Sequence, residues 1–295
     1  MIETLHAWQA GLPPFVFDFL KFFNGLVLLA VIFVPLERLF SLRPKAALRP
    51  GWRNDVAYYF LSSVLPNRLI VLPVAALFWV LQSVAPQGLL PGLGQLPGWE
   101  RFAAAMVFAE IGFYWGHRWL HASPRLWRFH AVHHSATELD WLVNTRAHPV
   151  DLVFVRLCGL LPLYVLGLAQ SARGEVDWVA LLVTLVGSLW GYVIHANLRW
   201  RFGWLEHVVA TPAFHHWHHD HLGAGGRQHG NYAAFLPVLD RLFGTWRLPA
   251  EAWPRRYGTD EPVRPGLVDQ IMAPFMGHAG GSIADRTSAG AARPQ

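Results

Sequence analysis

The sequence predicts an all-α integral membrane protein, in which a helical bundle of four to five spans is joined to a cytosolic helical cap. Of its 295 residues, 53% are hydrophobic and only 15% are charged, whereas about a quarter of the residues of a soluble domain are charged. The chain also contains 15 tryptophans, and tryptophan is enriched where a helix meets the membrane–water interface. The apolar residues gather in five long stretches, each of which can form a span.

The expected spans follow from the thickness of a bilayer, which requires about 20 mostly apolar residues per helix. The stretches that meet this requirement cover residues 15–34, 56–81, 101–120, 150–168 and 178–196. The second is long for one span and contains Pro66 and Pro73, so we expect either a kink or a broken pair of helices. The short loop 171–177 predicts a tight hairpin between the last two spans.

Positive charge predicts the orientation of the bundle. The loops on one side are rich in Lys and Arg, whereas the loops on the other side contain only Arg173. By the positive-inside rule the basic side is cytoplasmic, and we expect a bacterial inner membrane. The basic residues are Arg38, Arg43, Lys45, Arg49, Arg53, Arg118, Arg125, Arg128, Arg146, Arg199 and Arg201.

The domain organisation is expected to be simple. Residues 1–276 form a single domain whose cytosolic cap comprises 117–149 and 197–258, and the Gly/Ala-rich segment 277–295 is a disordered tail. The net charge of +5 reflects basic loops that face anionic lipid, and no pattern in the chain predicts a nucleic-acid partner. Cys158 is the single cysteine, which excludes an intramolecular disulfide.

Eight histidines in three tight clusters are the most informative feature for function. They form one HxxxH and two HxxHH patterns, and all three clusters fall on the cytoplasmic side of the expected bundle. Imidazole nitrogen is a ligand for iron, zinc and copper, and this number of imidazoles predicts a dinuclear metal site in the cap. The eight residues are His117, His121, His130, His133, His134, His215, His218 and His219.

Helical spacing predicts how these histidines divide between two ions. We expect the first two members of each triad to bind one ion and the last member to bind the other, because adjacent histidines diverge by about 100° on a helix. We also expect His117 and His121 to bind one ion each. His195 ends the fifth span on the same side of the membrane and is a ninth candidate ligand.

Several other kinds of metal protein fit the pattern less well. A zinc hydrolase would carry HExxH, which is absent, and a structural zinc site usually includes cysteine. Membrane haem would need opposed histidines at mid-depth. A metal transporter or storage protein would need ionisable residues along the spans, which are almost lacking. A nitrogen-rich site for two redox-active irons, which activates oxygen for attack on unactivated C–H bonds, fits best.

The motifs themselves resemble those of a known family. HRWLH (117–121), HAVHH (130–134) followed by Ser135, and HHWHH (215–219) are similar to the histidine boxes of the fatty acid hydroxylase/sterol desaturase superfamily. NTRAHPVD (144–151), HGNYA (229–233) and LDRLFGTW (239–246) also resemble family elements. The resemblance extends over roughly residues 15–258, and its motifs are specific to the superfamily rather than to one substrate.

This resemblance implies a di-iron centre, O₂ as co-substrate and a separate reductase that delivers electrons through a cytochrome b5-type or ferredoxin-type donor. The expected reaction is hydroxylation or desaturation of a lipid in the bilayer, either sterol-like or fatty acyl. Ether-lipid (alkylglycerol-type) monooxygenation is an alternative. The nine histidines would be the ligands. Some members of the family have a further histidine where this chain has Arg199, so a tenth ligand would be water held by Asn197, or His148, or His207.

Five polar residues are expected to support the site rather than bind metal directly. Glu110 would hydrogen-bond a ligand imidazole, or else pair with an arginine or a helix polar group, and Asn231 would hydrogen-bond ligand imidazoles. Asp240 would fix the cap by pairing with Arg241 or a metal-bound histidine, and His148 and Asn197 would act as above. His216 should face away from the metals. His221 and His229 are expected in a loop or lid.

Overall fold

The computed structural model describes residues 13–46, 48–84, 89–169, 178–221, 230–250, 252–259, 263 and 266–276. Within these ranges helices are the only regular elements, and two isolated bridges join Ser41 to Leu198 and Asp220 to Tyr257. The expected all-α class is therefore confirmed for the described chain. The loop 171–177, His229 and the tail 277–295 lie outside the described residues.

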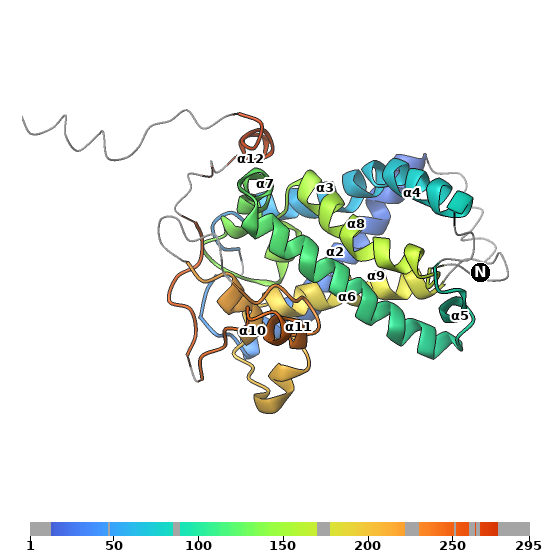
Figure 1. Cartoon of the computed structure of the whole chain (residues 1–295). Helices are drawn as coiled ribbons and strands as arrows, with labels where there is room; N and C mark the ends of the chain where they lie inside the picture. Colours follow the sequence, from blue (N-terminus) through green and yellow to red (C-terminus); the bar gives the residue numbers. More distant parts are fainter. Residues whose placement is uncertain are drawn as a thin grey trace, which may run out of the picture.

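The long helices run side by side and make up the body of the molecule (Figure 1). Their bounds lie close to the five apolar stretches, with the second stretch divided between two helices. They are α2 (Pro14–Leu39), α3 (Trp52–Leu69), α4 (Val71–Val84), α6 (Gly98–Ala122), α8 (Pro149–Val165) and α9 (Trp178–His195). The short α5 (Pro91–Gly94) precedes α6.

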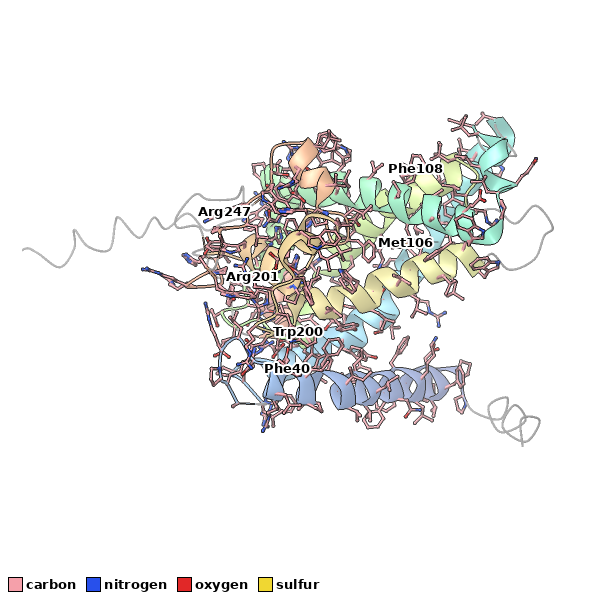
Figure 2. All side chains as sticks on the ribbon, turned by 90° about the horizontal axis from the view of Figure 1, so that it is seen from below. Phe40, Met106, Phe108, Trp200, Arg201 and Arg247 are labelled. Atoms are coloured by element: carbon pink, nitrogen blue, oxygen red, sulfur yellow. The ribbon has the colours of Figure 1, made fainter. Side chains whose placement is uncertain are left out.

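Short helices gather at the end of the bundle opposite α5 (Figure 1). Figure 2 shows Phe40, Trp200, Arg201 and Arg247 at this end, away from Met106 and Phe108 of α6. The short helices are α7 (Pro124–His134), η1 (Trp141–Thr145), η2 (Gly203–His207), α10 (Pro212–His218), α11 (Val238–Leu242) and α12 (Leu267–Met272).

Among the described residues, three helical segments are long and apolar enough to cross a membrane, namely 14–39, 52–81 and 178–195. They expose large apolar side chains, such as Phe15, Trp79 and Leu181, as helices facing lipid would. The remaining two expected spans form α6 and α8, which do not meet the same measure of length and hydropathy. α8 has 17 residues, which is the lower limit of length for a helix that spans a bilayer.

The second apolar stretch forms a broken pair of helices, which was one of the two expected outcomes. α3 ends at Leu69 and α4 begins at Val71. Pro66 lies in the last turn of α3 and Pro73 in the first turn of α4, and proline has no N–H to donate to the preceding turn. The two prolines therefore account for the break.

Glycines allow α6 and α8 to pack closely. A Cβ atom on Gly112 would overlap the carbonyl of Cys158, and one on Gly116 would lie 2.7 Å from the Cβ of Cys158. Gly112 and Gly116 are four residues apart and lie on the same face of the helix, the arrangement that lets membrane helices approach each other. This contact fixes the position of His117, next to Gly116, relative to the start of α8.

Proline and a side-chain cap begin each of three helices near the histidines. Pro124, Pro149 and Pro212 occupy the first positions of α7, α8 and α10, where their missing N–H has no helical partner to lose. Side chains at the preceding residues accept hydrogen bonds from the first turns; these are Ser123, His148 and Thr211. The starting points of these helices are thus fixed locally.

A buried ionic network connects the segment after α2 and the first turn of α3 to the two residues that flank η1. Arg49 contacts Asp55 at 2.5 Å and Asp140 at 2.6 Å, and Arg146 contacts Asp55 at 2.5 Å. All four side chains are almost fully buried. The network holds residue 146 in place, and its backbone carbonyl contacts one of the histidines described next.

Candidate metal centre

The nine candidate histidines come together at the cap end of the bundle in two groups. Within each group the ligand nitrogens lie within 4.8 Å of one another, and every member is buried. The five-histidine group consists of His117, His121, His130, His134 and His218. The four-histidine group consists of His133, His195, His215 and His219.

Four separate segments supply these side chains. His117 and His121 lie in the last turns of α6, and His195 is the last residue of α9. The triad of α7 ends that helix, while the second triad lies on α10 and at its C-cap, His219. The centre therefore forms where two long helices end and two short helices pack across them.

The division of the histidines between the groups differs from the expectation. His130 and His134, four residues apart, share one group, and His215 and His219 share the other. His117 and His121 also belong to the same group rather than to different ones. Side chains four residues apart are rotated by only about 40°, whereas those three apart are rotated by about 60° in the opposite sense, so the first and last members converge.

The middle member of each triad crosses to the other group. His133 of α7 joins the pair from α10, and His218 of α10 joins the pair from α7. The Nε2 atoms of His134 and His218 are 3.1 Å apart. Each group therefore depends on both short helices, so the two groups are interlocked.

Hydrogen bonds fix the tautomers in the four-histidine group. His133 Nδ1 donates to the carbonyl of Arg146 at 3.0 Å, and His195 Nδ1 donates to that of Gly191 at 2.7 Å. In neutral rings both Nε2 atoms are then acceptors, yet they lie 3.2 Å apart. Two acceptors at this distance cannot hydrogen-bond, but a cation between them would satisfy both lone pairs.

The five-histidine group is oriented in the same way. His117 Nδ1 donates to the carbonyl of Tyr232 at 2.7 Å, and His218 Nδ1 donates to that of Gly230 at 2.8 Å. His130 Nδ1 donates to the carboxylate of Asp151 at 2.9 Å, and its Nε2 lies 3.2 Å from Nε2 of His117. A carboxylate behind a histidine is a common support for a metal ligand.

The spacing and protonation of the rings fit a transition-metal ion. With metal–nitrogen bonds of about 2.1 Å, neighbouring ligand nitrogens lie roughly 3.0–3.4 Å apart, and Nε2 of His195 lies 3.0 Å from that of His215 and 3.3 Å from that of His219. Burial, together with the neighbouring histidines, lowers the pKa of His133 to about 3 and the pKa values of His134, His215 and His219 well below their usual range. The rings are therefore neutral, as metal ligands must be.

Two of the expected supporting residues have different partners from those predicted. Glu110 accepts hydrogen bonds from the backbone N–H groups of Phe235 and Leu236, at 2.7 and 3.2 Å. Asn231, at a positive φ of 54°, bonds through its side chain to the backbones of Phe214 and Arg247. Expecting imidazole partners was wrong for both, since each side chain satisfies backbone groups of the cap instead.

Asp240 supports the histidines through the backbone. Its carboxylate accepts hydrogen bonds from the N–H groups of Tyr232 and Ala233 at 2.8 and 2.9 Å, and from the hydroxyl of Thr245 at 2.6 Å. These contacts replace the expected pairing with Arg241 or a histidine. They hold the turn whose carbonyls, at residues 230 and 232, orient His218 and His117.

Of the candidates for a tenth ligand, His148 and His207 belong to neither histidine group. Asn197 forms two hydrogen bonds with the backbone of Arg43. His148 uses one ring nitrogen to cap α8 and the other to donate to the carbonyl of Ile271. His207 is exposed and packs on Trp246. His148 and His207 thus lie outside both groups, whereas a water held by Asn197 as tenth ligand stays a prediction.

His216 faces away from both groups, as expected. It is fully buried and bonds to the hydroxyl of Tyr257 and the carbonyl of Ala196. Asp151, by contrast, was missed as a supporting residue, although it ends the NTRAHPVD motif and follows a proline at a helix start. The backbone carbonyls that accept hydrogen bonds from the histidines could not be predicted from the sequence, because every residue has a backbone carbonyl.

A cavity of about 610 Å³ opens from the histidines into the bundle. His117, His130, His133, His195 and His215 line one end of it. The remaining wall is formed mainly by apolar residues of α2, α3, α6, α8 and α9. A C–H bond of an elongated apolar molecule could therefore lie beside the imidazoles, within the bundle.

The fold and the centre together define a class of protein: a helical membrane protein with two buried, neutral imidazole groups at the end of an apolar cavity. Residues 102–245 match the family model described as fatty acid hydroxylase. This part of the chain, which contains all nine histidines, is therefore similar to the fatty acid hydroxylase family. The resemblance inferred from the histidine motifs is confirmed.

Relatives include proteins that act on several kinds of lipid. An ornithine lipid hydroxylase of Rhizobium tropici is 36% identical over 58% of this chain and 49% of its own length. A methylsterol monooxygenase of Arabidopsis thaliana is 25% identical over 51% and 55%, and the human alkylglycerol monooxygenase 29% over 54% and 33%. The chain thus spans about half or less of the relatives it matches. No solved structure matches it.

Proposed function

We propose that this protein is a membrane-bound di-iron oxidoreductase that uses O₂ to hydroxylate or desaturate a C–H bond of a lipid. The observation that carries the proposal is the pair of interlocked imidazole groups at the end of an apolar cavity. The relatives support lipid as the substrate, because those named above act on an ornithine lipid, a methylsterol and an alkylglycerol.

The nine histidines would hold two iron ions, five imidazoles at one and four at the other. When bound, the irons supply the redox chemistry by which O₂ attacks an unactivated C–H bond. The chain itself orients the rings through Asp151 and backbone carbonyls, and the apolar cavity excludes water from the substrate. The four-histidine group has the smaller protein ligand set, and three of its members line the cavity.

The same proposal includes the surroundings of the enzyme. Four or five helices, with α6 and α8 among them, would cross a bacterial inner membrane and place the centre on its cytoplasmic face. The substrate would enter from the bilayer between the helices. A separate reductase, through a cytochrome b5-type or ferredoxin-type protein, would supply the electrons.

Ether-lipid monooxygenation is a second candidate. It is favoured by the similarity to alkylglycerol monooxygenases, of which the zebrafish protein is 31% identical over 54% of this chain. Both candidates require the same two groups of imidazoles. They differ in the lipid that occupies the cavity.

Metal content and lipid products test the proposal directly. The protein is purified in detergent beside the double variant His215→Ala/His219→Ala, which removes two of the four imidazoles of one group. We expect about two irons per chain in the wild type and at most one in the variant. Lipid extracts of cells that express the wild type should contain a hydroxylated or desaturated lipid that is absent with the variant. Bound haem, or an iron content that the variant shares, would contradict the proposal.

A further inference from the structure

One segment of the cap, η2 with the residues beside it, carries its apolar side chains on the outside. Its exposed large apolar residues are Phe202, Trp204, Leu205 and Val208, and Trp204 keeps 71% of its accessible surface. Glu206, the acidic residue of the same segment, is buried, accepts from the backbone N–H of Phe202 at 3.2 Å and pairs with Arg201 at 3.5 Å. A segment that faces water usually has the opposite distribution, with its charged residues outside and its large apolar residues inside.

The helix α11 shows the same inversion. Val238, Leu242 and Phe243 are exposed, and Leu242 also keeps 71% of its accessible surface. Asp240, between them, is fully buried and bonds to backbone N–H groups of the cap, so the exposed charged residue of this helix is the cation Arg241. We call the exposed apolar residues of the two segments the η2–α11 surface.

Both segments are attached to the sides of long helices. The indole N–H of Trp190 on α9 donates to the carbonyl of Ala210, which follows η2, at 3.0 Å. The ring of Trp190 packs on that of Phe235, which precedes α11, with 5.5 Å between centroids, and the N–H of Ala210 donates to the carbonyl of Phe235 at 3.0 Å. Phe243 packs on Trp115 of α6, with 5.0 Å between centroids. The η2–α11 surface therefore adjoins the outer sides of α6 and α9.

The position of Trp190 along α9 gives the level of this surface. α9 has 18 residues, or about 27 Å of helix, which is close to the thickness of the hydrocarbon core of a bilayer, about 30 Å. Its outer side exposes Leu181, Leu185 and Leu189. Trp190 lies five residues, or about 7.5 Å, before the cap end of the helix. The residues that contact Trp190 thus lie at the level where the hydrocarbon of a bilayer meets its headgroups.

The segment of α12 gives an independent indication of the same level. Figure 1 shows α11 and α12 on either side of α6, at the same end of the bundle. The carbonyl of Ile271 accepts from His148, which caps the start of α8, and Phe275 packs on the ring of His148. A flat bilayer meets a protein at one level on all its sides, and α12 is apolar on the outside as well. Its exposed large apolar residues are Val268, Met272, Phe275 and Met276.

We propose that the η2–α11 surface and α12 are immersed in the interfacial layer of the bilayer, so that this part of the cap contacts lipid instead of water. Short amphipathic segments bind membranes in this way. Trp204 suits the layer because indole is enriched where hydrocarbon meets headgroups, and Arg241 suits it because cations attract anionic lipid.

The proposal has a consequence for the cavity. Ala234 and Phe235, directly before α11, line the cavity that leads to the histidines. With α11 in the interfacial layer, a lipid of the adjoining leaflet lies beside this part of the cavity wall. The inference goes beyond the proposed oxidation and does not depend on it.

Spin labels test whether these segments lie in lipid. Cys158 is replaced by alanine, and Trp204→Cys, Leu242→Cys and Val268→Cys each introduce one labelling position. The full chain is placed in vesicles of phosphatidylglycerol and phosphatidylethanolamine. Relaxation of each label is measured with oxygen, which concentrates in hydrocarbon, and with a water-soluble nickel chelate. We expect all three labels to be relaxed more strongly by oxygen than by the chelate.

Two further labels calibrate the measurement. Leu185→Cys lies on the exposed apolar side of α9 and should respond mainly to oxygen, whereas Arg255→Cys lies at an exposed position of the cap and should respond mainly to the chelate. Val208→Cys supplies another position beside η2 if Trp204→Cys fails to fold. A chelate response equal to that of the Arg255 label would overturn the proposal for the segment that carries the label. Protection from both reagents would also overturn it, with a second copy of the chain or another protein as the cover.

The membrane surface and the proposed function fail separately. Lipid exposure of the labels, in a protein that forms no lipid product, would uphold the membrane surface and reject the oxidation. An oxidised lipid product, together with labels that respond to the chelate, would reject the membrane surface alone.

Discussion

At the scale of single residues, Asp151 acts most directly on the histidine groups. It is buried at the start of α8 and accepts the Nδ1–H of His130, so it fixes the ring and raises the basicity of the nitrogen that faces the five-histidine group. Replacing the carboxylate by an amide keeps the shape but removes the charge.

We expect Asp151→Asn to lower the iron affinity of the five-histidine group about 10–100-fold, as is usual when such a partner is lost. Iron per chain is measured after exposure to increasing concentrations of a chelator. One of the two irons should be lost at lower chelator concentration than in the wild type. Asp220→Asn, which alters an ion pair with Arg247 outside both groups, is the matched control. Identical iron retention in the two variants would contradict this role for Asp151.

Asp55 is the residue on which the buried ionic network depends, because both Arg49 and Arg146 contact its carboxylate. Removing one partner of a buried pair leaves the other charge without compensation. We expect Asp55→Asn to lower the free energy of unfolding by about 3–5 kcal/mol, measured by denaturation in detergent. Asp18→Asn removes half of a solvent-exposed pair with Arg68 and should change stability by less than about 1 kcal/mol. Similar losses in the two variants would argue against the network.

At the scale of elements, the glycine contact between α6 and α8 aligns two parts of the centre. α6 carries His117 and His121, and α8 carries Asp151. We expect Gly112→Ala to force the helices apart and to destabilise the protein by about 1–3 kcal/mol, with weaker iron retention. Thermal midpoint and iron content measure the two effects. Gly187→Ala on α9 is the control, since no atom lies within 4 Å of the added Cβ. A Gly112→Ala protein as stable as this control would refute the prediction.

The elements also show how far sequence reasoning reaches. The spacing of the histidines identified eight of the nine members of the two groups, because residues three and four apart share a helix face, and His195 was found from its position at the end of the fifth span. The spacing did not predict that His133 joins the histidines of α10 and that His218 joins those of α7, because this depends on how the two helices cross. Glu110 was assigned an imidazole partner because it lies seven residues before His117 on the same helix face. For Glu110 and Asn231 alike, backbone N–H and C=O groups compete for the polar side chain, and a sequence does not display that competition.

At the scale of the whole molecule, the cap and the bundle are stabilised in different ways. Apolar helix packing and the ionic network hold the bundle, whereas acceptor nitrogens of the cap face one another at about 3 Å. We expect chelation of the metals to lower the thermal midpoint by roughly 10 °C or more, because metal binding contributes several kcal/mol to such sites.

Hydrogen exchange after chelation should rise in α7 and α10 and remain low in α2 and α3. The Asp55→Asn variant provides a contrast, since its exchange should rise near α3 and η1 even with metal bound. A uniform change in hydrogen exchange along the chain would contradict this difference between cap and bundle.

The helical bundle could be predicted from hydropathy, and the two prolines predicted either a kink or a break in the second apolar stretch. The number of helices that span the bilayer could not be predicted in the same way, because α6 and α8 pack against other helices and are less apolar or shorter than the other spans.

The interlocking of the two histidine groups has a consequence for loading. An ion in the five-histidine group would fix α7 against α10 and so position His133, His215 and His219, three of the four imidazoles of the other group. The ordering cost of the second site is then largely met by the first, which is positive cooperativity between ions. With half of the iron needed for saturation, native mass spectrometry should find mainly empty and doubly loaded chains. The centre would behave as one switch-like unit rather than as two independent sites.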